Sequence, residues 1–361
     1  MSETPADFAV LGSTPLARLI AGLLASAHGK QVVWVGDSQA AYRLPRGLDL
    51  SVAPATRPET WALLAQTVPE TVKLLSRAGG KAGTMRLDPI FFADTPGGQQ
   101  ALAYLRSSAA GFGSAIERLP TGHLGKGRDG IVLRDAIYLR RDRLEPVLDR
   151  WLDGLKVTRL PLSQTHVVIA ANGSASITVD GVVIEAARTV LADDEAILAL
   201  LPADALSELF ERQTMTTILT EPTFAMAARV MLQVDADLSF VQGSHRGVTA
   251  IGMGDHDACV THIGVLLGAN RQLRQAGGTS HERLRSRDGA PVLGRPNGSG
   301  PELLAGLGAS GAFLAPALAR WFVGAAKPEE LDYFAARIPH RPMAPSTVAD
   351  YAPADPALAA A

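Results

Sequence analysis

Two apolar runs separated by a helix-like segment open the chain. Residues 7–11 and 31–35 are almost wholly apolar, and residues 16–27 between them are rich in alanine and leucine. Strands buried on both faces of a parallel sheet show such continuous apolar runs. Gly29 supplies a helix-ending signal. The pattern predicts a strand–helix–strand unit with a turn at residues 12–17, at the chain start where dinucleotide-binding folds place theirs.

The middle of the chain mixes helical periodicity with short alternating strands. Apolar residues at helical spacing predict helices over 59–78, 98–110 and 196–212. Residues 156–185 read as a β-meander with turns at Asn172-Gly173 and Asp180-Gly181. Further strands are predicted over the ranges 189–192, 224–232, 247–251 and 259–263.

The C-terminal part repeats the strand–turn–helix pattern. A tight turn and short strand over residues 287–296 precede a glycine-rich loop at 306–311 and an apolar helix that runs to 323. Pro316 suits the first turn of that helix, because N–H groups in the first turn have no partner within the helix and proline lacks one. An amphipathic stretch at 327–338 follows. Proline and alanine then dominate, and we expect residues 341–361 to form a flexible tail.

Length and composition narrow the class of protein. A chain of 361 residues exceeds one compact core and predicts two joined lobes. With 34 basic and 36 acidic residues, nucleic acid and anionic membranes are not expected as main partners. The single Cys259 excludes an internal disulfide, suits a reducing cytoplasm and reads as a buried strand thiol. Residues 1–7 lack the basic start of a signal peptide, so a cytoplasmic location is expected.

The first turn carries a partial dinucleotide fingerprint. In the G-x-G-x-x-G/A pattern, Gly12 supplies the tight turn and Ala17 allows close helix packing, but Thr14 stands where the second glycine lets the backbone approach a pyrophosphate. The acidic residue expected at the end of the second strand is Gly36 by register, and Asp37 follows one residue later.

Two C-terminal segments carry a family resemblance. Residues 288–294 read DGAPVLG and residues 306–320 read GLGASGAFLAPALAR. They resemble the segment that closes over the flavin in the FAD-dependent D-amino acid oxidase/glycine oxidase/sarcosine oxidase superfamily, in which loop histidines usually stand at the positions of Ala309 and Ala312. The resemblance implies an α/β fold, with a Rossmann-like FAD-binding lobe and an antiparallel-sheet α+β substrate lobe. The ranges it assigns are 1–50, 135–200 and 285–340 to the FAD lobe, and 51–134 and 201–284 to the substrate lobe.

The same resemblance implies a cofactor and a substrate. FAD is expected with its pyrophosphate over the first turn and its ring near the second, and the protein as an oxidoreductase acting on the C–N bond of an amine or amino acid. Arg283, five residues before Asp288, matches the arginine that binds a substrate carboxylate, although solvated arginines at 283, 285 and 287 are an equal alternative. The predicted cofactor-binding residues are Gly12, Ser13, Thr14, Ala17, Asp37, Arg43, Gly294, Gly308, Ala309, Ser310, Gly311 and Ala312.

Several departures keep other functions open. Residues 193–195 are Asp-Asp-Glu where the family has a small-residue turn beside the cofactor. Pointing inward, these carboxylates would repel a pyrophosphate; facing solvent, which we favour, they would cap a helix beginning near 196. A non-catalytic or partner-dependent flavoprotein subunit is therefore one alternative, and a flavin monooxygenase using NAD(P)H is another. No histidine cluster indicates a metal, and His262 and His281 are possible polar contacts that are more typical of structural roles.

Overall fold

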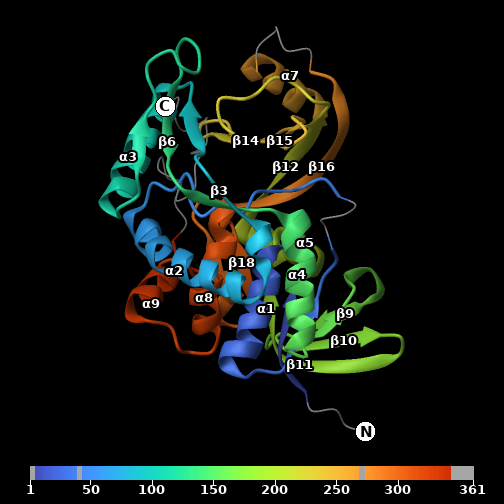
Figure 1. Ribbon diagram of the computed structural model, residues 1–361. Helices are drawn as coiled ribbons and strands as arrows, with labels where there is room; N and C mark the ends of the chain where they lie inside the picture. Colours follow the sequence, from blue (N-terminus) through green and yellow to red (C-terminus); the bar gives the residue numbers. More distant parts are fainter. Residues whose placement is uncertain (1–4, 39–42, 268–272, 343–361) are drawn as a thin grey trace.

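The computed structural model describes residues 5–38, 43–267 and 273–342, and the predicted tail from 343 onward lies outside them. Figure 1 shows two lobes, each built around one sheet. None of the described helices is long and apolar enough to cross a membrane.

The first lobe contains a mostly parallel sheet. Strand β1 is its centre and pairs in parallel with β11 on one side and β2 on the other. The parallel pairing extends to β18 and to β8 at the two sides. An antiparallel β9–β10 ribbon continues from β11. Its strands, in sheet order and then the ribbon, are β17 (Val292–Gly294), β18 (Glu302–Ala305), β11 (Val182–Leu191), β1 (Ala6–Leu11), β2 (Val32–Val35), β8 (Thr158–Leu160), β10 (Ala175–Val179) and β9 (His166–Ile169).

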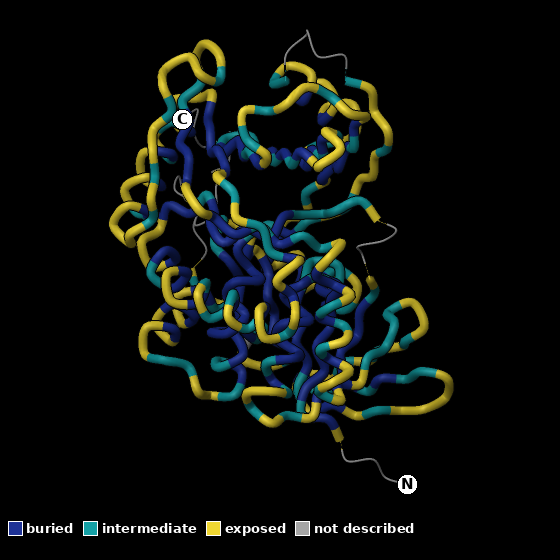
Figure 2. Tube along the Cα trace, in the orientation of Figure 1, coloured by how far each residue is buried: buried dark blue, intermediate teal, exposed yellow. Residues whose placement is uncertain are grey.

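Helices cover both faces of this sheet and bury its apolar residues. On one face α1 packs against α4 and α8, and α8 packs against α2. Helix α5 packs on the other face, against β9, β11 and β18. The dark-blue centre of this lobe in Figure 2 is the resulting core. The helices of this lobe are α1 (Pro15–His28), α2 (Pro58–Arg77), α4 (Arg141–Gly154), α5 (Asp194–Leu200), α8 (Gly311–Phe322) and α9 (Pro328–Ala335).

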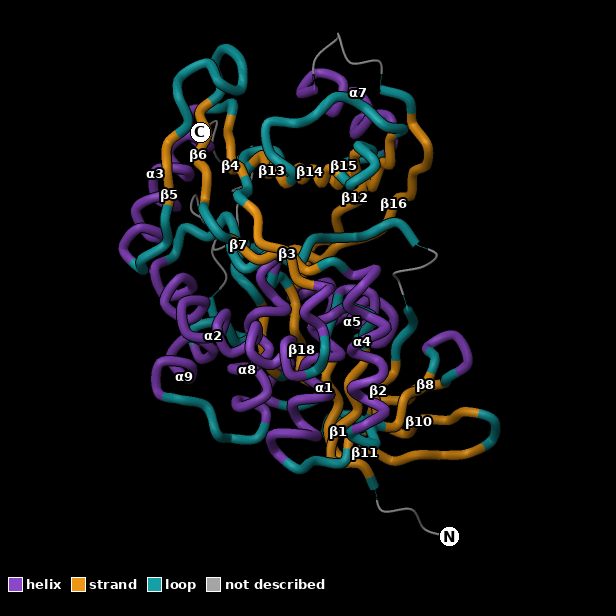
Figure 3. The backbone as a smooth tube through the Cα atoms, viewed as in Figure 1, coloured by secondary structure: helices purple, strands orange, loops and turns teal. Residues whose placement is uncertain are grey.

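The second lobe is a largely antiparallel sheet, drawn at the top of Figure 3. All its pairings are antiparallel except β13 with β4. In sheet order its strands are β16 (Gln275–Ser286), β12 (Phe210–Thr220), β15 (Val248–Met253), β14 (Leu238–Gln242), β13 (Val230–Gln233), β4 (Ile90–Ala93), β6 (Asp129–Leu133) and β5 (Ile116–Arg118).

The second lobe's remaining elements are α3 (Pro96–Gly111), α6 (Ala203–Leu209), α7 (His256–Leu267) and the pair β3 (Thr84–Leu87) and β7 (Ala136–Leu139). The predicted fold class, a Rossmann-like lobe joined to a mainly antiparallel α+β lobe, is confirmed. The strands of the first sheet all come from the three ranges assigned to the FAD lobe. The boundaries of that division stay a prediction.

Some predicted elements are wrong. Residues 259–263 belong to helix α7, because Asp255 accepts a hydrogen bond from the Ala258 N–H and starts a helix on which Cys259 and Ile263, four residues apart, share the buried face. Cys259 is therefore buried as predicted, but on a helix. Pro316 lies inside α8, which begins at Gly311. The predicted strand at 224–232 is limited to Val230–Gln233, and the helix at 196–212 is divided into α5 and α6.

Candidate ligand pocket between the two lobes

A pocket of about 480 Å³ lies where the two lobes meet. Its walls come from the first turn, the segment after β2, the start of α5, strands β12, β15 and β16, and the C-terminal glycine loop. Both glycine-containing turns therefore border one pocket, as the sequence predicts. The predicted site residues in its lining are Thr14, Arg283, Gly308, Ala309, Gly311 and Ala312.

The other predicted cofactor residues are outside the lining and have other partners. The Arg43 side chain pairs with Glu195 at 3.3 Å. The Asp37 carboxylate accepts a hydrogen bond from the Leu162 N–H at 3.1 Å, so it serves the loop after β8. Gly294 faces Trp321 of α8, whose ring would lie 3.2 Å from a Cβ added there. The members of this group are Gly12, Ser13, Ala17, Asp37, Arg43, Gly294 and Ser310.

The N-terminal turn is held by groups of the chain itself. Gly12 has φ of +147°, a conformation suited to glycine. Its carbonyl accepts a hydrogen bond from the Trp34 indole N–H at 3.0 Å, and the Ser13 carbonyl accepts one from the Arg18 guanidinium at 2.7 Å. Arg18 is fully buried, lies over the Trp34 ring and pairs with Asp149 at 2.8 Å. Side chains of α1 and β2 therefore hold the turn in place through hydrogen bonds to its carbonyls.

The carboxylate of Asp193 reaches this turn from the far end of β11. One oxygen accepts a hydrogen bond from the Ser13 N–H at 2.6 Å, and the other accepts one from the Ala196 N–H at 2.9 Å. The predicted helix cap is therefore confirmed, but the expectation that these carboxylates face solvent is wrong for Asp193. Burial raises the pKa of Asp193, against the two backbone hydrogen bonds that lower it. The tight packing of β1 beside β11 brings these two distant segments together.

The C-terminal loop closes the opposite wall. Gly306 and Gly308 have φ of +71° and +55°, in the left-handed region that favours glycine. The Ala309 carbonyl accepts a hydrogen bond from the Leu50 N–H at 2.8 Å, which ties the loop to the segment after β2. Asp288 in the preceding turn is held by Arg341 at 2.8 Å. The loop is therefore tied to the segment after β2, while the turn before it is held by Arg341.

Carboxylates outnumber cations in the pocket lining, with seven aspartates and glutamates against four arginines. Three of the arginines already have carboxylate partners within the lining. The pairs are Arg141–Asp49 at 2.6 Å, Arg46–Glu195 at 3.0 Å and Arg283–Asp237, in which Arg283 also donates to Gln213 at 2.8 Å. The pocket is therefore acidic and suits a ligand that carries positive charge.

Asp194 and His281 are perturbed by this environment. Burial raises the pKa of Asp194 to about 6, although the Leu284 N–H, at 3.1 Å, and the charge of Arg283 oppose the rise. Burial, with the charge of Arg46, lowers the pKa of His281 to about 4, so its imidazole is neutral at pH 7. The His281 Nδ1 atom is buried and has no hydrogen-bond partner among the described residues. Perturbed groups gathered in a cleft are typical of functional sites.

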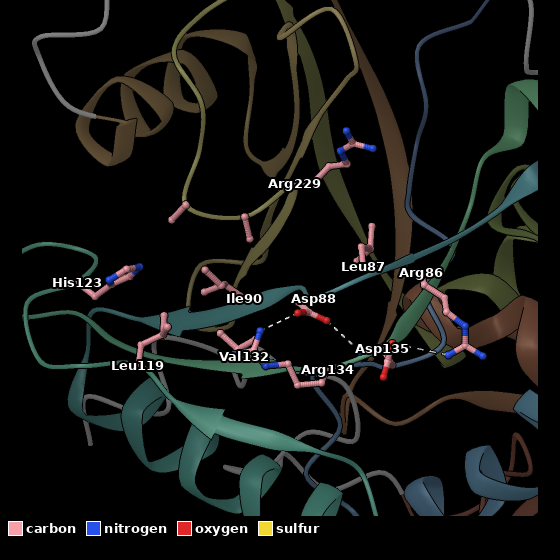
Figure 4. A pocket seen from close by; sticks show the side chains of 12 residues that line it. Arg86, Leu87, Asp88, Ile90, Leu119, His123, Val132, Arg134, Asp135 and Arg229 are labelled. Atoms are coloured by element: carbon pink, nitrogen blue, oxygen red, sulfur yellow. Dashed lines mark hydrogen bonds and ion pairs between the residues drawn. The ribbon is translucent and has the colours of Figure 1, made fainter.

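A second, more open groove of about 560 Å³ lies elsewhere on the molecule (Figure 4). Its lining shares no residue with the inter-lobe pocket. In Figure 4 Arg134 is joined to Asp88, at 2.7 Å, and Arg134 also pairs with Glu117 at 2.6 Å. The Arg134 guanidinium is thus paired, and the groove lies away from both glycine turns. The inter-lobe pocket is therefore the candidate site.

The two ends of the predicted FAD site differ in how well they fit the cofactor. The glycine loop and inter-lobe pocket leave space on the ring side, but the phosphate side does not fit. The Ser13 N–H that would face a phosphate already donates to Asp193. Gly36 leaves no acidic side chain for the ribose hydroxyls, and a Cβ there would lie 2.4 Å from the Gly12 carbonyl oxygen. The resemblance implies that FAD binds at this turn, but the turn does not fit its phosphates.

Together the two lobes and the pocket between them define the fold of the D-amino acid oxidase class of FAD-dependent oxidoreductases, as predicted from the resemblance. Solved structures with this fold include glycine oxidase from Geobacillus kaustophilus, at 16% identity and a TM-score of 0.72, covering 94% of this chain and 100% of that one. Iminodiacetate oxidase from Chelativorans sp. BNC1 is 19% identical, with a TM-score of 0.64 and coverage of 91% and 98%.

L-proline dehydrogenase from P. horikoshii, at 13% identity and a TM-score of 0.68, covers 93% of this chain and 97% of that one. No protein-family model and no curated protein matches the sequence. At these identities the likeness shows the fold, and the activity must be argued from this chain's own residues.

Proposed function

We propose that this chain binds a small amine or amino acid in the inter-lobe pocket. The observation that supports this most directly is that opposite charges line the pocket close together. Asp194 and Arg283 both lie in its lining, and the Asp194 carboxylate accepts a hydrogen bond at 3.1 Å from the N–H of Leu284, the residue after Arg283. An ammonium group would face Asp194, and a carboxylate would face Arg283. Glycine oxidase and iminodiacetate oxidase, named above, share this architecture.

The charge balance of the lining favours the ammonium over the carboxylate. The carboxylates beyond the three arginine pairs already have partners: Asp193, Asp194 and Asp235 accept backbone hydrogen bonds, and Glu282 pairs with Arg212 at 3.2 Å. What favours an ammonium is therefore the net negative charge of the lining. Arg283 already holds Asp237 and Gln213, but a guanidinium has five N–H donors, so a ligand carboxylate can share it. The neutral His281 adds an acceptor nitrogen for a donating ligand group.

A panel of ligands tests this proposal by calorimetry. Primary amines and zwitterionic amino acids are expected to bind, and carboxylic acids without an amine are not. Asp194→Asn should weaken amine binding by about tenfold or more, since a charged hydrogen bond is worth roughly 1.5–3 kcal/mol. Glu208→Gln, which removes an exposed carboxylate on α6, is the matched control and should change nothing. Equal binding of acids and amines by the folded protein would contradict the proposal.

A second candidate is the FAD-dependent oxidation of the C–N bond of the same ligand. It is favoured by the loop Gly308–Ser310, part of which lines the pocket in the position expected to face a flavin ring. Purified protein with a flavin absorbance that an amine bleaches would support this function. A colourless protein that still binds amines would favour the non-catalytic alternative, and bleaching by NAD(P)H alone would favour the monooxygenase.

A further inference from the structure

We propose that the Asp193 carboxylate acts as a built-in anion that occupies the phosphate position at the Gly12 turn and excludes FAD and other dinucleotides from it. This goes beyond the proposed function, because it concerns the phosphate end of the site and holds whichever small ligand the inter-lobe pocket takes. It is compatible with ligand binding there and opposes the second candidate, FAD-dependent oxidation.

The contact geometry places the carboxylate directly on the turn. Its Oδ2 atom lies 2.6 Å from the Ser13 nitrogen. A Cβ added to Gly12 would meet the same oxygen at 2.9 Å and the carboxyl carbon at 3.0 Å, so the carboxyl group sits in the space that the glycine leaves open. In a dinucleotide turn the phosphate lies against this backbone, and its oxygens accept from N–H groups at the helix N-terminus.

Helix capping by itself does not account for this arrangement. Capping α5 needs only the oxygen that accepts from the Ala196 N–H. The second oxygen reaches a residue 180 positions away in the sequence. The adjacent acidic residues do not have this contact: Asp194 accepts from the Leu284 N–H at 3.1 Å, and Glu195 pairs with Arg46 at 3.0 Å. The contact with the turn is therefore a property of Asp193 and not of the acidic segment as a whole.

Three other polar groups of the turn also have partners. The Thr14 hydroxyl accepts from the Ala17 N–H, and the carbonyls of Gly12 and Ser13 accept from Trp34 and Arg18. A phosphate approaching the Ser13 N–H would meet the Asp193 carboxylate at the same donor. Two anions sharing one donor repel each other, so binding of either disfavours the other.

The test compares binding of FAD and ADP by calorimetry at low salt in the wild type and in variants. Wild type is expected to purify without flavin and to show no saturable binding of either probe. Asp193→Ala opens the Ser13 N–H and should bind both at least tenfold more tightly than wild type. Glu208→Gln removes an exposed carboxylate on α6, outside the pocket lining, and should behave as wild type.

Asp193→Asn covers the case in which the alanine variant fails to fold, because it keeps a side-chain oxygen for capping α5 and removes the charge. A gain of ADP binding in a folded Asp193 variant, with none in Glu208→Gln, supports the proposal. Stoichiometric FAD binding by wild type, displaced by ADP, overturns it, and so does the absence of any gain in a folded Asp193 variant. Amine binding by wild type is measured without a nucleotide, so failure of the proposed function is seen separately.

Discussion

Replacing Asp194 with asparagine should stabilise the protein at neutral pH and leave its stability in acid nearly unchanged. The carboxyl group of Asp194 has its pKa raised from 3.8 to about 6, chiefly by burial, so the folded state favours its protonated form. Asparagine has a similar shape, and its side-chain oxygen can still accept from the Leu284 N–H at 3.1 Å. The substitution therefore removes the cost of the buried charge while retaining the hydrogen bond.

The magnitude follows from the difference between the two pKa values. Between pH 3.8 and about 6 the folded state binds more protons at Asp194 than the unfolded state, so the free energy of unfolding falls as pH rises through this window. Each pKa unit corresponds to about 1.4 kcal/mol, so the loss is complete above pH 6 and reaches about 3 kcal/mol. Asp194→Asn should recover up to this amount at pH 7.5 and about none near pH 4.

Urea unfolding at several pH values between 4 and 8, followed by circular dichroism, measures this difference. Glu208→Gln removes an exposed carboxylate and serves as the control, with no pH-dependent gain expected. A gain of the same size at every pH would indicate a packing effect and would refute the electrostatic reasoning. A loss at pH 7.5 would show that the Asp194 charge is stabilised in the folded protein.

Three further substitutions or measurements test the site and the core. Arg283→Ala should weaken binding of a carboxylate-bearing ligand by about 30-fold to a few thousandfold, from a loss of roughly 2–5 kcal/mol, and affect a simple amine far less; equal effects on both ligands in calorimetry would contradict its role. Gly36→Ala should lower the free energy of unfolding by roughly 1–3 kcal/mol, because the new Cβ would lie 2.4 Å from the Gly12 oxygen, whereas Gly154→Ala, where nothing lies within 4 Å, should be neutral or stabilising. Burial raises the pKa of the Cys259 thiol, so its reaction with a thiol reagent should be at least about tenfold slower than in the urea-unfolded chain, and equal rates would show that α7 opens readily.

Local patterns were enough to predict the frame of the molecule. Neighbouring residues define the apolar runs of β1 and β2 and the turn at Gly12. The sequence therefore predicts these strands and their parallel pairing directly. The glycine loop before α8 carries a similarly local signal. The prediction was wrong for α7, because its sequence is compatible with two local patterns. Alternation suggested a strand, while the cap at Asp255 and the four-residue spacing of buried positions specified a helix.

The direction of the Asp193 side chain could not be obtained in this way. From the sequence, a run of three acidic residues at a helix start is compatible with both orientations and favours solvent exposure. The pairing of β1 with β11 sets the end of one strand beside the end of the other, and only then does the Ser13 N–H lie 2.6 Å from a carboxylate 180 residues away. The sequence by itself thus determined the fold and the two turns that border the pocket. The tertiary structure decided which anion meets the first turn, because that contact depends on a distance between segments that no local pattern encodes.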